Sequence, residues 1–200
     1  MEQVPSAAHK PAPPKRLTKG DWLDAGLTVL GRKGAGGVRI DAICKQLGVT
    51  KGSFYWHFTD RGDLMTSIVE HWDNQATERM IASIEGATDD PKARLWHLVH
   101  NVTLGDYDVG IEVAMRQWAH EDPTIRTRLE GIDAKRIAFF QRQFQSLGFV
   151  PEAARLRAHT LYSVTLVREY MHTGEARAAL AQRMQASVDL LTQGPQTTAP

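Results

Sequence analysis

The feature that most constrains the fold is an apolar pattern that recurs about every 3.6 residues from Trp22 to Leu191. No alternating apolar and polar run is long enough to require a β-strand. The internal prolines agree with this pattern, because Asp-Pro at 90–91 and 122–123 and Pro-Glu at 151–152 have the composition of helix starts. The sequence therefore predicts an all-α protein of about nine helices.

Composition excludes several classes of protein. No apolar run approaches the roughly 18 residues that a membrane span needs, and residues 1–16 contain no apolar segment typical of a secretory signal. The single cysteine, Cys44, excludes an internal disulfide and a cysteine-rich zinc site. Cys44 lies on an apolar helix face, which favours a small buried residue over a redox switch. We expect a cytoplasmic protein without cofactor or metal.

Charge and proline divide the chain. Residues 1–62 hold 10 Lys and Arg against 5 Asp and Glu, whereas residues 63–200 hold 14 against 18. A basic first part on an acidic remainder suggests a polyanion-binding module joined to a second domain. Prolines concentrate near both ends, so residues 1–16 and 194–200 are expected to be disordered tails, the first of them basic.

A helix-turn-helix pattern occupies residues 40–58. Two short apolar-faced segments are separated by Gly48-Val49-Thr50. Gly48 can adopt the positive φ that ends a helix, Val49 can fill the gap between the helices, and Thr50 can cap the second one. Phe54 and Phe58 are one turn apart and are expected to face the core. The other side chains of this second helix then project away from the core, and most can donate hydrogen bonds.

The stretch VRIDAICKQLGVTKGSFYWHFTDRGDL resembles the DNA-binding signature of the TetR (tetracycline-repressor) family of bacterial regulators. The run LGVTKGSFYWHF is especially similar. The resemblance implies a three-helix, helix-turn-helix DNA-binding domain over residues 17–72. It also implies that residues 73–193 form a helical domain that binds a small ligand and makes a homodimer.

The resemblance further implies which residues meet DNA. The helix after Thr50 would enter the major groove with its first residues near base edges, and neighbouring side chains would hold phosphates. Arg61 stands where the family usually has a lysine, and Arg39 stands where many members have a capping Thr or Ser. The implied DNA-binding residues are Arg39, Thr50, Lys51, Gly52, Ser53, Tyr55, Trp56, His57 and Arg61.

Two features of this region have simpler interpretations. Tyr55 and Trp56 could be core aromatics, and for Trp56 that interpretation is favoured over a direct role with DNA. The glycine-rich segment 31–37 lacks the Gly-Lys-Ser/Thr ending of a phosphate-binding loop. We therefore expect a turn between helices there.

The second domain contains polar and aromatic residues within otherwise apolar helices. A pocket built from them would suit a flat or amphipathic molecule, although each Trp or Met at helical spacing is individually more typical of core. Arg168 could pair with Glu112 or with a ligand carboxylate. His97 and His100 are three residues apart, but without a nearby Cys or acidic pair a metal site is not favoured. The candidate ligand-binding residues are Trp96, His100, Tyr107, Glu112, Met115, Trp118, Phe140, Tyr162 and Arg168.

The last helix predicts a dimer. Leu180, Met184, Val188 and Leu191 form an apolar stripe that needs a partner, and the family pairs its last two helices between subunits. Two subunits would read a palindromic double-stranded operator, because a two-fold axis repeats the half-site. The helix that begins near Leu64 and runs to about Glu85 would be the lever between the domains.

Together these patterns predict a transcriptional repressor that a small molecule releases from its operator. The alternative is an activator, or a regulator of the same fold without a ligand, and the sequence does not distinguish these from a ligand-released repressor. A helical enzyme or small-molecule carrier is more distant, because no nucleophile elbow, zinc-protease, Walker or paired-carboxylate signature occurs. We therefore expect that the chain is not an enzyme.

Overall fold

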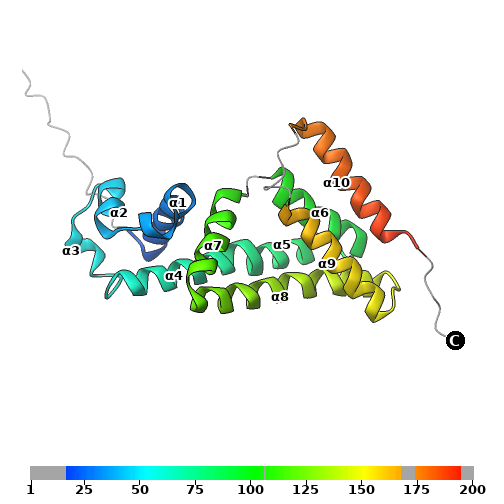
Figure 1. Ribbon diagram of the computed structural model, residues 1–200, viewed down its shortest axis with the longest axis horizontal. Helices are drawn as coiled ribbons and strands as arrows, with labels where there is room; N and C mark the ends of the chain where they lie inside the picture. The colour runs from blue at the N-terminus through cyan, green and yellow to red at the C-terminus, as the bar shows by residue number, and fades with distance from the viewer. Residues whose placement is uncertain (1–16, 106, 168–173, 195–200) are drawn as a thin grey trace, which may run out of the picture.

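The computed structural model describes residues 17–105, 107–167 and 174–194, and over these ranges all regular structure is helical (Figure 1). In chain order the elements are α1 (Lys19–Gly37), α2 (Ile40–Leu47), α3 (Lys51–Phe54), α4 (Arg61–Asp73), the π-helical turn η1 (Asn74–Glu78), α5 (Arg79–Ala87), α6 (Pro91–Leu104), α7 (Val109–Glu121), α8 (Pro123–Ser146), α9 (Pro151–Val167) and α10 (Arg177–Thr192). Because α4, η1 and α5 are continuous, these residues form nine helical rods. The prediction of an all-α fold with about nine helices is confirmed.

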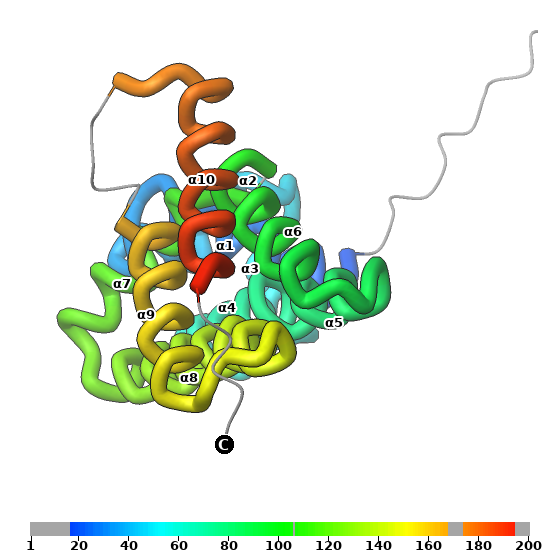
Figure 2. Tube along the Cα trace, turned by 90° about the vertical axis from the view of Figure 1, so that its right-hand side faces the viewer, coloured from blue at the N-terminus to red at the C-terminus, as the bar shows by residue number. Residues whose placement is uncertain are grey.

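The molecule is elongated, with different helices at its two ends (Figure 1). Helices α1, α2 and α3 gather at one end, and α9 and α10 lie at the other. The continuous rod of α4, η1 and α5 joins the two ends, and α8 runs beside it. Seen from the far end, α10 lies in front, with α6 and α9 on either side of it (Figure 2).

The helix starts follow the local chemistry that the sequence predicts. Asp90 and Asp122 each cap a helix whose first residue is proline, by accepting hydrogen bonds from backbone N–H groups. Asp60 caps α4 in the same way by accepting from the Asp63 N–H at 2.9 Å. Gly48 ends α2 with a φ of 68°, as predicted. Thr50 has the backbone conformation of a capping residue, but its hydroxyl makes no capping hydrogen bond.

One local prediction is confirmed in part and another needs correction. The glycine-rich segment 31–37 is included in α1, but the backbone leaves the helical conformation at Gly34, where φ is 68°, so the predicted turn lies within α1. The fourth helix does not run as one regular α-helix. It is interrupted by the π-helical turn η1 before it continues to Ala87. Such turns insert one extra residue into a helix and often occur at functional sites.

Two apolar clusters fill the interior. The first joins α1 to α4 with α7 and the beginning of α8, so it extends past the predicted domain boundary at residue 72. Its largest fully buried side chains include Trp22 and Phe54. The second cluster joins α5, α6, the later part of α8, α9 and α10. Among the helices of the described ranges, none combines the length and the apolar character that a membrane crossing requires.

Candidate DNA-binding surface and ligand cavity

The helix-turn-helix is fixed from behind by aromatic packing. Phe54 and Phe58, one turn apart, are buried and stack with their ring centroids 5.3 Å apart. The buried ring of Trp22 in α1 meets the edge of Phe54 at 5.6 Å. Such ring pairs contribute about 0.5–1.5 kcal/mol beyond area burial. The prediction that both phenylalanines face the core is confirmed, and this anchoring sets which face of α3 points outward.

The outward face presents two large aromatic side chains. Tyr55 is 59% exposed and Trp56 is 79% exposed. The interpretation of Trp56 as a core aromatic is therefore wrong. After α3 ends at Phe54, the chain turns before Phe58 returns to the core, and Trp56 lies on the outside of that turn. Exposed aromatic residues of this size are unusual on a surface without a partner.

Cationic side chains meet beside Tyr55. Arg39, Lys51, Tyr55 and Arg61 all line one shallow depression on the surface. The Lys51 ammonium lies 2.7 Å from the Asp41 carboxylate, and both side chains are well exposed. Arg61 donates to the Val38 and Ala35 carbonyl oxygens at 2.7 and 2.8 Å, which ties the start of α4 to the end of α1. In this structure the guanidinium of Arg61 thus has a structural role that the sequence did not predict.

The remaining candidates lie on or near the same face. Thr50 and Gly52 are exposed at the start of α3, and Ser53 is half-buried. His57 is also half-buried, with its ring 6.3 Å from the ring of Trp22. Arg39 precedes α2 without forming a side-chain cap, which agrees with its departure from the capping Thr or Ser. The structure thus brings all nine predicted residues to one end of the molecule.

A cavity opens between η1, α7 and the helices of the second cluster. It has about 640 Å³ of empty space when its open mouth is counted. Its enclosed part holds only a few water molecules, so a larger ligand must spread the lining side chains. The lining residues are Ala76, Thr77, Met80, Ile81, Leu98, Val102, Tyr107, Val109, Glu112, Arg136, Phe139, Phe140, Tyr162, Thr165 and Leu166.

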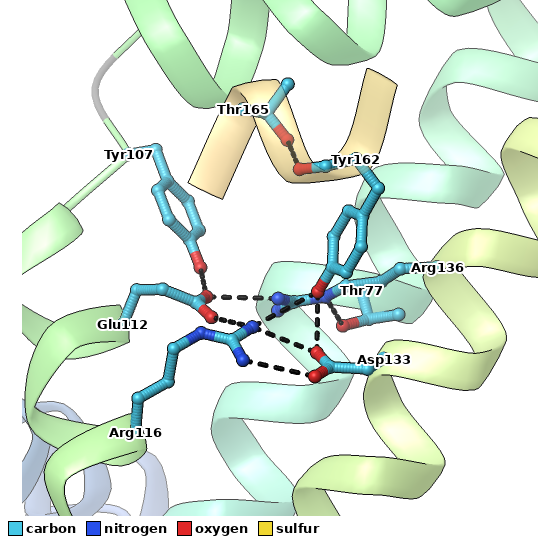
Figure 3. A network of polar contacts seen from close by, with 8 residues as sticks. All are labelled: Thr77, Tyr107, Glu112, Arg116, Asp133, Arg136, Tyr162 and Thr165. Carbon is cyan, nitrogen blue, oxygen red and sulfur yellow. Dashed lines mark hydrogen bonds and ion pairs between the residues drawn. The ribbon is translucent and has the colours of Figure 1, made fainter. Parts of the chain in front are cut away.

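Polar groups meet at one wall of this cavity (Figure 3). Glu112 of α7 accepts from the Tyr107 hydroxyl at 2.6 Å and from Arg136 Nη1 at 3.0 Å. Its other oxygen lies 2.7 Å from Arg116 Nη2. Arg136 Nε donates to the Thr77 hydroxyl at 3.0 Å, and Thr77 belongs to the π-helical turn. One buried guanidinium therefore links α8 to the irregular turn, in addition to the ion pair between Lys135 and Glu78.

The network continues to α9. Both terminal nitrogens of Arg116 donate to the Asp133 carboxylate, at 3.1 and 2.9 Å. The Tyr162 hydroxyl donates to the same carboxylate at 2.6 Å. Three helices and the π-helical turn are thus linked by charge-assisted hydrogen bonds, which are stronger than neutral ones. Two guanidinium groups face two carboxylates, so the charges balance.

The protonation states follow from this arrangement. Burial acts to raise the pKa of Glu112, but the charges of Arg136 and Arg116 outweigh burial and lower it. Glu112 is therefore ionised at neutral pH. Burial and the neighbouring Asp133 raise the pKa of Tyr162 to about 12, against the lowering effect of Arg136 and Arg116. Tyr162 therefore keeps its proton and remains a donor.

The structure separates the nine predicted ligand residues. Tyr107, Glu112, Phe140 and Tyr162 line the cavity. Met115 and Trp118 instead pack in the first cluster, against the DNA-binding end. The ring of Trp96 meets His100 at 5.6 Å on α6, away from the cavity lining, so the predicted pocket residues do not form one site.

The pairing predicted for Arg168 cannot be compared directly, because Arg168 lies outside the described residues. Glu112 instead pairs with Arg136 and Arg116. Both arginines were missed in the sequence, although Arg136 carried a signal. It lies four residues after Ile132 and three before Phe139, on the buried face of α8. A charged residue on an apolar stripe indicates a buried partner.

The predicted dimer stripe is covered within one chain. Met184 and Val188 are fully buried, and Leu180 and Leu191 pack against the same second cluster, where α10 lies on α6 and α9. Met184 and Val188 therefore need no second subunit to be buried. Contact of the half-buried Leu180 and Leu191 with another subunit stays a prediction. Other apolar side chains at this end are exposed, including Leu156 of α9 and Leu190 of α10.

Across the described ranges, no three His, Cys, Asp or Glu side chains are grouped so that they could hold a metal ion.

Residues 23–68, which contain the helix-turn-helix, match the family described as bacterial regulatory proteins, tetR family. This stretch of the chain is therefore similar to the DNA-binding region of that family. Among solved structures, a transcriptional regulator from Rhodococcus sp. Rha1 has the same fold. It aligns with a TM-score of 0.74 at 15% identity, over 92% of this chain and 100% of that one.

Two curated relatives are similar in part of their length. The transcriptional regulator AcrR of Shigella flexneri is 35% identical over 63 residues, which are 32% of this chain and 29% of that protein. The transcriptional regulator AcuR of Cereibacter sphaeroides is 32% identical over 98 residues, 46% of this chain and 45% of that protein. The matches thus span less than half of either relative.

Proposed function

We propose that this chain is a TetR-family DNA-binding transcriptional regulator that acts in the cytoplasm, and specifically a repressor that a small molecule releases from its operator. The observation that carries the proposal is the surface formed by α3 and the turn after it. Tyr55 and Trp56 are exposed there, and Tyr55 lies beside Lys51 and Arg39. Cationic and hydrogen-bonding groups on a short, exposed helix suit entry into the major groove. The DNA-binding residues are those implied by the resemblance, with Trp56 retained because it is exposed.

Binding to DNA from around the chain's own gene tests this proposal. The wild type should bind one fragment selectively over a scrambled fragment of equal length, measured by fluorescence anisotropy. Tyr55→Ala should reduce the affinity about tenfold or more and leave the melting temperature near that of the wild type. Equal binding of wild type and Tyr55→Ala to both fragments would contradict the proposal.

We further propose that the active form is a homodimer on a palindromic operator, with α9 and α10 at the interface. Leu156 and Leu190 are 66% and 69% exposed, although both are large and apolar. Leu156→Glu with Leu190→Glu should convert the dimer to a monomer in sedimentation velocity. Met184→Leu, in the covered stripe, is the matched control and should remain a dimer. A double variant that stays dimeric would place the interface elsewhere.

The proposed release depends on α7. Its Glu112 lines the cavity, and its first turn packs against α1, where a Cβ added to Gly31 would lie 3.1 Å from Ile111 Cγ1. A ligand that spreads the cavity would shift α7 and hence α1, so it would favour a state with different DNA affinity. An activator would use the same contacts between α7 and α1. Whether transcription rises or falls when the chain binds its operator distinguishes an activator from a repressor. The cavity serves binding and not catalysis in this proposal.

A further inference from the structure

The cavity offers one hydrogen-bond donor that the described protein does not use. Arg136 lines the cavity and is 9% exposed. Its Nε and Nη1 donate to Thr77 and Glu112, but among the described residues its Nη2 has no hydrogen-bond partner. A buried donor without a partner destabilises the folded state. A ligand that supplies an acceptor at this point removes that unfavourable contribution.

The carboxylates of the same wall already have cationic partners. One oxygen of Glu112 accepts two hydrogen bonds. The other accepts none from the described residues, but it lies 2.7 Å from Arg116 Nη2, on the side of an arginine that does not line the cavity. Asp133 accepts from Arg116 and from Tyr162. The wall therefore selects a ligand acceptor and offers little to a ligand donor or cation.

Charge balance then decides between a neutral and an anionic acceptor. Arg116 and Arg136 face Glu112 and Asp133, so the wall is neutral before a ligand enters (Figure 3). A carboxylate would bring an uncompensated negative charge into a mostly apolar cavity, which is costly. An uncharged carbonyl can accept from Arg136 Nη2 and leave the balance intact.

The other residues that line the cavity determine which apolar part of a ligand fits. Met80, Ile81, Leu98 and Val102 are aliphatic, and Phe139 and Phe140 complete the apolar surface. Because the enclosed space is narrow, a slender chain displaces fewer side chains than a fused ring system does. The cavity thus favours an alkyl chain.

We infer that the effector is an uncharged aliphatic molecule with a carbonyl-type acceptor that binds Arg136 Nη2, such as a medium-chain ester or ketone. This inference rests on the proposed function, because it names the ligand class of the same regulatory cavity. Glu112 is the residue that sets specificity, since its negative charge keeps Arg136 from selecting an anion.

Three probes with the same alkyl chain test the inference: methyl decanoate, decanoate and decyltrimethylammonium. Isothermal titration calorimetry measures their affinity for the full chain below their aggregation concentrations. We expect methyl decanoate to bind the wild type at least tenfold more tightly than either charged probe. Tighter or equal binding of decanoate, or no binding of methyl decanoate, would overturn the inference.

The charge argument has its own test in Glu112→Gln. This substitution keeps the side-chain shape and gives the wall one net positive charge, so decanoate should bind at least tenfold more tightly than it binds the wild type. Tyr162→Phe is the matched control, because it changes the same wall without changing its charge and should keep the preference for the ester. An unaltered preference in folded Glu112→Gln would overturn the role assigned to Glu112.

Calorimetry needs no DNA, which separates this inference from the proposed function. A chain that binds the ester but no DNA refutes only the regulator, and a chain that binds DNA but prefers decanoate refutes only the ligand class. If Glu112→Gln does not fold, the preferences of the wild type and Tyr162→Phe still decide the ligand class.

Discussion

The DNA-binding surface and the ligand cavity use polar side chains in opposite ways. On α3 and beside it, Tyr55 and Lys51 stand in solvent, and the Lys51–Asp41 ion pair is open to exchange with another partner. Around the cavity, Glu112 and Arg136 are buried and hydrogen-bonded to each other. The first region is therefore available for recognition at little structural cost, whereas the second is coupled to the stability of the whole helical bundle.

The largest expected effect comes from breaking the buried network. Glu112→Ala leaves Arg136 without its carboxylate partner, so the free energy of unfolding should fall by about 3–5 kcal/mol in urea denaturation. Adding Arg136→Met should restore most of this loss, because the unpaired charge is then removed. A double variant as unstable as the single one would show that the ion pair is not the cause.

Two neighbouring residues at the end of α3, one buried and one exposed, test the comparison further. Phe54→Ala empties a fully buried site and should cost about 3–5 kcal/mol of unfolding free energy. Tyr55→Ala removes an exposed ring that meets Phe54 edge-on at 5.2 Å, so its cost should be below about 1.5 kcal/mol. DNA affinity should fall in Tyr55→Ala at temperatures where it is fully folded. The assignment of the two faces would be wrong if the stability losses were reversed.

The contact between α1 and α7 tests whether the two regions are coupled. Gly31→Ala places a Cβ 3.1 Å from Ile111 Cγ1 and 3.3 Å from its backbone nitrogen, which should cost about 1–3 kcal/mol through overpacking. It should also change DNA affinity, although Gly31 is on another helix than the DNA-facing residues. Gly131→Ala on the exposed side of α8, where the added Cβ has open space, is the matched control. Equal DNA affinity in both variants would argue against coupling through α7.

The smallest effect appears at alkaline pH. Because burial raises the pKa of Tyr162 to about 12 from an ordinary 10.0, the protonated form is favoured in the folded chain. Its contribution to stability is complete below pH 10 and is lost as the pH rises through 12. Unfolding free energy measured across this range should fall more steeply for wild type than for Tyr162→Phe. Identical slopes would show that Tyr162 does not titrate with folding.

The sequence predicts the first region better than the second for a physical reason. The helix-turn-helix is local, since Gly48, Phe54 and Phe58 fix its geometry within a few residues of one another. The cavity wall joins Thr77, Glu112 and Arg136 from three distant segments, and helical periodicity gives the face of each residue but not its partner. Trp56 shows a further limit, because periodicity fails where α3 ends after one turn.

The dimer stripe illustrates the same limit at the far end. The spacing of Leu180, Met184, Val188 and Leu191 correctly indicates one apolar face, but spacing alone does not say whether another helix of the same chain or a second subunit covers it. In the structure α6 and α9 cover it. How α6, α9 and α10 pack together determines what covers the stripe, and the local sequence of α10 does not specify that packing.

Hydrogen–deuterium exchange with and without DNA from around the chain's own gene tests the central claim most directly. If α3 meets DNA, amide exchange should slow between Arg39 and Arg61 and remain unchanged along the interior of α8. The backbone of the exposed turn after Phe54 should show the strongest protection. Protection confined to α9 and α10, with none between Arg39 and Arg61, would contradict the assignment of the DNA-binding surface.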